Sequence, residues 1–287
     1  MQINQLHPLF AAEIIGIDTS ASVTPETIRI VEDAMAKYGV CVIRGASLND
    51  EDQIRFSRAF GSIEMPPAAE ASRRPNVARE LFDVTNLDAN GDILPNKMDP
   101  KTLEILEGFH TDSPFNTLPT KWSLLLGHVV PPVGANTNYI DTRAVYDDLP
   151  QAMKDRIENL VAVHNLFDAF EQRGVKFGSE AMRQAYPAMS YPLVRRSANG
   201  RKALYFGWHA VSVVGLPDAE SAALLQELYA FATQAKFIYS HKWRQGDLVI
   251  WDNRCSMHAA TPFERERYKR DCRRTTINED GAAPAAA

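Results

Sequence analysis

Cysteine is scarce in this chain of 287 residues, which contains only Cys41, Cys255 and Cys272. An odd and sparse set does not suit a disulfide framework, so we expect a reducing, cytoplasmic setting in which each thiol is a packing residue. No apolar run approaches the roughly 20 residues that a membrane span needs. The N-terminus also lacks the basic start and apolar stretch of a secretory signal. The sequence therefore predicts a cytoplasmic protein without a membrane partner.

Excess positive charge is missing as well. The formal net charge is −5 and the pI is near 5.8, so nucleic acid is not an expected partner. Apolar residues make up 45% of the chain and charged residues 23%, close to the globular average. A chain of this length can build one large domain with a substantial core. We expect a single domain at residues 1–280 and a flexible, low-complexity tail at 281–287.

Local patterns predict many strands and few helices. Thr24 is a good N-cap for a helix at 25–37, and Asn49 begins a second helix that Gly61 ends. Residues 62–108 show little periodicity and contain several prolines, so we interpret them as a lid, with a short strand or turn near 82–86. Further strands are expected at 12–18, 39–44, 122–130, 138–141, 191–206, 237–243 and 247–251, and further helices at 144–149, 151–160 and 219–234.

This pattern indicates an α+β or mainly β fold. We predict a double-stranded β-helix (jelly-roll) core with surrounding helices and a long lid insertion.

Two histidines and one aspartate carry the chemistry. His110 and Asp112 are two residues apart, which on a strand directs both side chains to one face. His258 follows an apolar strand and the turn at 251–253. Two imidazoles and one carboxylate with open positions are typical of the facial triad of non-haem Fe(II) oxygenases. A zinc hydrolase with the same three ligands, and a jelly-roll binding protein without enzymatic activity, are the alternatives.

The chain resembles the taurine dioxygenase and 2,4-dichlorophenoxyacetate dioxygenase family of Fe(II)/2-oxoglutarate-dependent oxygenases. The resemblance extends over nearly the whole chain, and the herbicide-degrading branch is the nearer one. The segments that carry it are 6–10, 16–18, 39–45, 58–61, 110–112, 131–137, 251–255 and 273–277.

The resemblance implies roles for residues beyond the triad. Thr137, 25 residues after Asp112, and Arg270, twelve residues after His258, would bind 2-oxoglutarate. Arginine suits the distal carboxylate because its planar fork pairs with it bidentately. Arg274, on the same face of the expected last strand, would contact an anionic group of the substrate.

Two further substrate contacts follow from the resemblance alone. They are Asn86 in the lid and His209. Related aryloxyacetate enzymes carry a second histidine three residues after the position of His209, where this chain has Ser212.

The implied reaction uses Fe(II), 2-oxoglutarate and O2. It hydroxylates a small anionic substrate and releases succinate and CO2. For an aryloxyalkanoate, hydroxylation beside the ether oxygen gives a hemiacetal that collapses to a phenol and a 2-oxo acid. An alkylsulfonate, a sulfate ester or another small carboxylate is the alternative substrate. The resemblance allows for a homo-oligomer, although no sequence patch identifies an interface.

Overall fold

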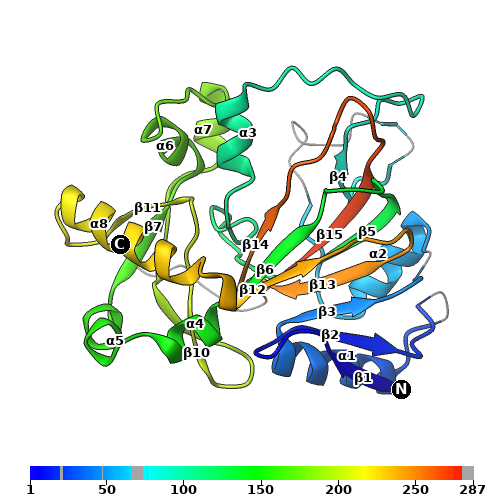
Figure 1. Cartoon of the computed structure of the whole chain (residues 1–287), viewed down its shortest axis with the longest axis horizontal. Helices are drawn as coiled ribbons and strands as arrows, with labels where there is room; N and C mark the ends of the chain where they lie inside the picture. The colour runs from blue at the N-terminus through cyan, green and yellow to red at the C-terminus, as the bar shows by residue number, and fades with distance from the viewer. Residues whose placement is uncertain (20–21, 47, 66–73, 76, 280–287) are drawn as a thin grey trace.

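The computed structural model describes residues 1–19, 22–46, 48–65, 74–75 and 77–279 (Figure 1). The expected tail at 281–287 and residues 66–73 and 76 of the expected lid lie outside the described residues. The described part has a mixed α/β fold with a large sheet, a facing smaller sheet, and helices around both.

The large sheet has seven strands in the order β1-β2-β3-β13-β5-β15-β4. Its neighbours pair antiparallel except β2 and β3, which are parallel. The strands are β1 (Gln2–Gln5), β2 (Ala12–Ile15), β3 (Val40–Ile43), β4 (Phe82–Thr85), β5 (Thr120–Val129), β13 (Leu248–Asp252) and β15 (Asp271–Asn278).

The smaller sheet has the order β12-β6-β14, all antiparallel. Its strands are β6 (Thr137–Asp141), β12 (Ile238–His241, after a 3-10 turn at Ala235–Phe237) and β14 (Ser256–Ala260). Tyr139 of β6 packs in one apolar cluster with Val42, Leu125 and Trp251 of the large sheet. The two sheets therefore face each other across a buried core.

Helices cover the outer face of each sheet (Figure 1). Helices α1 (Pro25–Tyr38) and α2 (Asp50–Arg58) pack Met35 and Phe56 against Leu124 and Ile250 of the large sheet. Helices α4 (Thr142–Asp148) and α8 (Asp218–Ala232) cover Ile140 and Met257 of the smaller sheet. Each sheet is therefore covered on both faces, by the other sheet on the inside and by helices on the outside.

Three short helices gather at one end of the facing sheets, at the top left of Figure 1. They are α3 (Pro100–Leu106), α6 (Leu166–Glu171) and α7 (Glu180–Ala185). The remaining elements are α5 (Gln151–Ile157), the three-stranded sheet of β11 (Ala210–Val213), β7 (Val161–His164) and β8 (Met189–Pro192), and the pair β9 (Val194–Arg196) and β10 (Lys202–Leu204). No described helix combines the length and apolar character needed to cross a bilayer.

Capping explains where the first two helices begin. Thr24 Oγ1 accepts a hydrogen bond from the Thr27 N–H, and Asn49 Oδ1 accepts one from the Asp52 N–H. Both contacts satisfy an amide that has no partner within its helix. These predictions from the sequence are confirmed.

The segment His110–Thr111–Asp112 differs from the expected strand. His110 forms a single antiparallel bridge with His258, and the chain then turns at Ser113, whose φ is 49°. The N–H groups of Thr111 and Asp112 donate to side chains, His209 Nε2 and Asn253 Oδ1, instead of to a neighbouring strand. The strand prediction was therefore wrong for this segment, because side chains replace the expected ladder.

Candidate metal centre and substrate cavity

His110, Asp112 and His258 converge in the structure. Each offers one ligand atom, and the three atoms lie within 4.8 Å of one another. The bridge between His110 and His258 consists of two backbone hydrogen bonds of 3.0 and 2.8 Å. The two histidines are thus brought together by the backbone, although 147 residues separate them in the sequence.

Hydrogen bonds orient the ligand side chains. His110 Nδ1–H donates to the Gly108 carbonyl at 2.8 Å, which leaves Nε2 free as a ligand. Ser123 Oγ donates to Asp112 Oδ2 at 2.7 Å, while Asp112 Oδ1 lies 3.8 Å from His258 Nε2. Asp112 and His258 are buried and His110 is half-buried, and this set of two imidazoles and one carboxylate fits a divalent metal ion of the type bound by facial triads.

Asn253 links the triad to the turn before β14. Its Oδ1 accepts hydrogen bonds from the Asp112 N–H at 3.0 Å and from Trp251 Nε1 at 3.1 Å. Its Nδ2 donates to Ser123 Oγ at 2.9 Å. The sequence predicted a turn at 251–253 that fixes the strand of His258. Trp251 and Asp252 instead end β13, and the turn begins at Asn253. The sequence gave no sign that Asn253 also holds Asp112.

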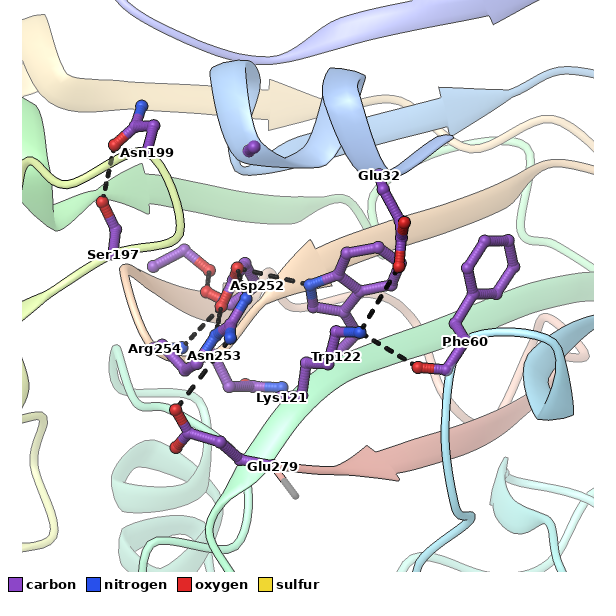
Figure 2. Close-up of polar contacts among 12 residues, drawn as sticks. Glu32, Phe60, Lys121, Trp122, Ser197, Asn199, Asp252, Asn253, Arg254 and Glu279 are labelled. Atoms are coloured by element: carbon purple, nitrogen blue, oxygen red, sulfur yellow. Dashed lines mark hydrogen bonds and ion pairs between the residues drawn. The ribbon is translucent and has the colours of Figure 1, made fainter. Parts of the chain in front are cut away.

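Ion pairs fix the same turn from the other side (Figure 2). Asp252 accepts a hydrogen bond from Trp122 Nε1 at 3.3 Å and pairs with Arg254, which also lies 3.9 Å from Glu279. Burial raises the pKa of the Asp252 carboxyl, but Arg254 outweighs it, so the pKa falls below the usual value. Asp252 is therefore an anchored anion at the base of β14.

Arg274 contacts the triad directly. Its guanidinium pairs with Asp112 and lies over the Phe82 ring, 4.6 Å from the centroid. Burial raises the pKa of Asp112, but Arg274, followed by His258 and His110, lowers it to about 2. The same strand directs Arg273 to the opposite face, where it pairs with Asp50, as expected for a structural residue.

Arg270 and Thr137 both lie near Tyr139. Burial raises the pKa of Tyr139 well above its usual value, while Thr137 and the Arg270 guanidinium act in the opposite direction. The Tyr139 ring in turn stacks on His258 at 6.2 Å between centroids. Arg270 is only 9% exposed, yet no carboxylate of the described residues pairs with it. A buried guanidinium without a counter-ion suits an anionic co-substrate.

Asn86 lies away from the cavity and supports the backbone around Arg270. Its Nδ2 donates to the carbonyls of Arg265 and Tyr268, at 2.6 and 2.9 Å. Its Oδ1 accepts from the Arg270 N–H at 2.8 Å. All of its polar side-chain atoms therefore serve this loop.

A cavity of about 350 Å³ opens beside the triad. Its polar wall includes Glu64, His209 and Arg274 together with residues 110–113. Its apolar wall comes from β4, the three short helices and neighbouring loops, through Phe82, Leu106, Phe115, Leu166, Phe177, Met182, Tyr186 and Trp208. A larger groove of about 960 Å³ lies between α3 and residues 259–267, but it contains none of the three ligand residues.

Glu64 is a cavity residue that the sequence did not suggest. Its carboxylate accepts hydrogen bonds from Ser113 Oγ and Asn116 Nδ2, both at 2.9 Å, and a longer one from Thr120. Burial raises the pKa of Glu64, and Arg274 opposes that shift. No sequence motif marks this position, because its partners lie about 50 residues away.

The comparisons with known proteins agree with this geometry. Residues 2–276 match the family model of "Taurine catabolism dioxygenase TauD, TfdA family". The chain belongs to this family and is a 2-oxoglutarate-dependent dioxygenase, as the resemblance predicted.

Three relatives illustrate the range of the family. The 2,4-dichlorophenoxyacetate dioxygenase of Cupriavidus pinatubonensis is 38% identical, covering 96% of this chain and 97% of the relative. An alkylsulfatase of Acinetobacter baylyi is 27% identical, with coverages of 96% and 84%. The crystal structure of AAD-2 in complex with Mn(II) and N-oxalylglycine is 34% identical and superposes with a TM-score of 0.89, covering all of both chains.

Proposed function

We propose that this chain is an Fe(II)- and 2-oxoglutarate-dependent dioxygenase that hydroxylates a small aromatic carboxylate, with an aryloxyalkanoate as the favoured class. The observation that carries the proposal is a triad, buried at Asp112 and His258 and half-buried at His110, beside a cavity with one arginine and a largely aromatic wall. Hydroxylation beside the ether oxygen would release a phenol and a 2-oxo acid, with succinate and CO2 as co-products.

Each residue has a defined part in this proposal. His110, Asp112 and His258 would hold Fe(II), which couples decarboxylation of 2-oxoglutarate by O2 to substrate hydroxylation when it is bound. Thr137 and Arg270 would bind 2-oxoglutarate, Arg270 through its guanidinium, which has no carboxylate partner among the described residues. Ser123 keeps Asp112 Oδ2 in place and leaves Oδ1 toward the histidines.

Arg274 would bind the carboxylate of the substrate. In the structure its guanidinium pairs with Asp112. With a metal ion held by the triad, Asp112 would be shared with that ion, and the Arg274 guanidinium would be available to an anion at the cavity wall. A substrate anion there places its aromatic body against Phe82 and Trp208, and fixes the C–H bond that reacts.

A sulfate ester is the second candidate substrate class. It is supported by the 27% identity to an alkylsulfatase and by an apolar wall that also suits an alkyl chain. Five aromatic side chains along the wall favour an aryl group over an alkyl chain. A zinc hydrolase is disfavoured because it has no use for Arg270.

We further propose that the two facing sheets form a double-stranded β-helix and that the described part of residues 62–108 covers the site as a lid. A single domain at 1–280, a cytoplasmic location, homo-oligomerisation and the absence of nucleic-acid or membrane partners stay predictions. Asn86 and His209 are proposed as supports of the site, as their hydrogen bonds suggest.

The decisive experiment is an anaerobic titration of the metal-free protein with Fe(II) and 2-oxoglutarate, followed by visible absorption. Wild type should develop a weak metal-to-ligand charge-transfer band, and Arg270→Gln should lose it at the same ligand concentrations. Arg265→Gln is the matched control, because Arg265 lies on the adjacent loop and pairs with Glu107. Absence of the band in folded wild type would refute the proposal and favour the zinc hydrolase.

Substrate class is tested next by succinate formation. Aryloxyacetates, alkyl sulfates and alkylsulfonates are compared at equal concentration, and Arg274→Gln should raise the KM of the preferred acid. Turnover of alkyl sulfates alone would replace the aryloxyalkanoate by the second candidate.

A further inference from the structure

A buried histidine on the cavity wall contacts a second buried histidine behind it. His209 lies on the wall and is 2% exposed, whereas His164, at the end of β7, is fully buried and does not line the cavity. Their Nδ1 atoms are 3.0 Å apart. The other ring nitrogen of His209, Nε2, accepts the Thr111 N–H at 3.3 Å. Thr111 is the residue between the two ligands of the H-x-D motif.

These contacts define the tautomers of both rings. A backbone N–H can only donate, so His209 Nε2 carries no proton and Nδ1 carries it. That proton must then be donated to His164 Nδ1, which places the proton of His164 on its Nε2. Because His209 Nε2 and His164 Nδ1 each accept a hydrogen bond, neither ring carries a second proton, and burial lowers the pKa of His164 to about 3 in agreement with this.

The segment around His209 also packs closely on the backbone of the motif. Trp208 N–H donates to the Phe109 carbonyl at 3.0 Å. A Cβ at Gly207 would lie 2.8 Å from His110 Cα and equally close to His209 Nε2. Only glycine fits at this position, which lets residues 207–209 support residues 109–111 from behind.

We propose that His209 is a positioning residue for the metal-binding segment, with its tautomer set by His164, and that it offers no N–H to the substrate. This inference rests on the proposed metal centre.

The charges along the cavity wall also narrow the class of substrate. Arg274 is the only lysine or arginine that lines the cavity among the described residues, so the pocket binds a substrate with one anionic group and an otherwise apolar body.

The tautomer can be tested in the metal-free protein. Long-range proton–nitrogen NMR of isotope-labelled histidine should show His209 protonated at Nδ1 and His164 protonated at Nε2. A His209 ring protonated at Nε2 would overturn the inference, whatever metal the protein binds.

Two variants of His164 test the consequence for the metal. His164→Asn keeps an acceptor near the position of Nδ1, whereas His164→Leu removes it. We expect His164→Leu to weaken Mn(II) binding about tenfold, as loss of an outer partner of a metal site typically does. His164→Asn should stay within about threefold of wild type, and thermal unfolding reports whether both variants fold.

Kinetics separate positioning from substrate binding. His164→Leu should lower kcat and increase 2-oxoglutarate consumption without product, and leave the KM of the substrate unchanged. A raised KM with normal Mn(II) affinity would instead make His209 a substrate ligand and overturn the inference. If wild type binds no Mn(II), the proposed function fails, whereas equal Mn(II) affinity of wild type and His164→Leu defeats this inference alone.

Discussion

Asn253→Ala should destabilise both the fold and the metal centre. Asn253 is 1% exposed, and among the described residues only its side chain accepts hydrogen bonds from two buried donors, the Asp112 N–H and Trp251 Nε1. A buried donor left without a partner costs about 1–3 kcal/mol. Thr111 keeps its bond to the Asn253 carbonyl at 2.8 Å, and Ser123 keeps its bond to Asp112, so neither adds to the loss.

The two lost hydrogen bonds together predict a loss of about 2–6 kcal/mol in the free energy of unfolding. This is a large share of the roughly 5–15 kcal/mol that stabilises a typical domain. Urea denaturation of the metal-free protein measures the change directly, and Mn(II) titration measures its effect on the centre.

Asn278→Ala is the control, because Asn278 makes one exposed side-chain hydrogen bond, of 3.2 Å to Ser62. We expect that variant to stay within about 0.5 kcal/mol of wild type. If Asn253→Ala unfolds like Asn278→Ala and binds Mn(II) like wild type, the assignment of Asn253 as the link between turn and triad is refuted.

Three further changes have defined outcomes. Gly207→Ala should sharply reduce Mn(II) affinity and turnover, because its Cβ would meet the His110 backbone at 2.8 Å; unchanged Mn(II) affinity would contradict the close packing. Glu64→Gln should lower the KM of an anionic substrate several-fold, because about 1 kcal/mol of repulsion is lost where Glu64 is ionised. Burial raises the pKa of Glu64, so the difference should be smaller at low pH than at high pH; steady-state kinetics as a function of pH checks this, and an equal KM at every pH would contradict it. Acidification should destabilise the metal-free protein, because unfolded histidine takes up a proton near pH 6.5 whereas buried His164, with a pKa of about 3, does not. Between these two pH values, His164→Asn should reduce the slope of the unfolding free energy against pH by up to about 1.4 kcal/mol per pH unit, measured by urea titrations. An unchanged slope would contradict the burial of a neutral His164 ring.

Sequence patterns were sufficient wherever a local rule determines the structure. The caps Thr24 and Asn49 mark the starts of α1 and α2, and the position of Arg274 on β15 follows from strand alternation. The spacing of His110, Asp112 and His258 predicted a metal site, and the structure places their ligand atoms within 4.8 Å of one another. The caps and the alternation along β15 depend on residue type and short separations, whereas His258 was matched to the distant H-x-D motif by the residue types of a facial triad.

Contacts between distant segments could not be predicted in this way. Asn253 was interpreted as a turn residue because its bonds to Asp112 span 141 residues. Glu64 lies in a proline-rich stretch without periodicity, and α3 was missed within the same region. The strand expected at His110–Asp112 fails for the same reason, since its amide partners are side chains from residues 209 and 253.

The place of β15 has a consequence for how the enzyme is assembled. This strand follows every other element in the sequence, yet it lies between β5 and β4 inside the large sheet. Until it inserts, β4 has no neighbour in that sheet, and both arginines proposed for ligand binding are absent from the core. Pairings between distant segments form slowly. A chain still being synthesised would therefore hold the three proposed metal ligands without the two arginines proposed to anchor co-substrate and substrate, so the proposed site would be complete only after β15 has closed the sheet.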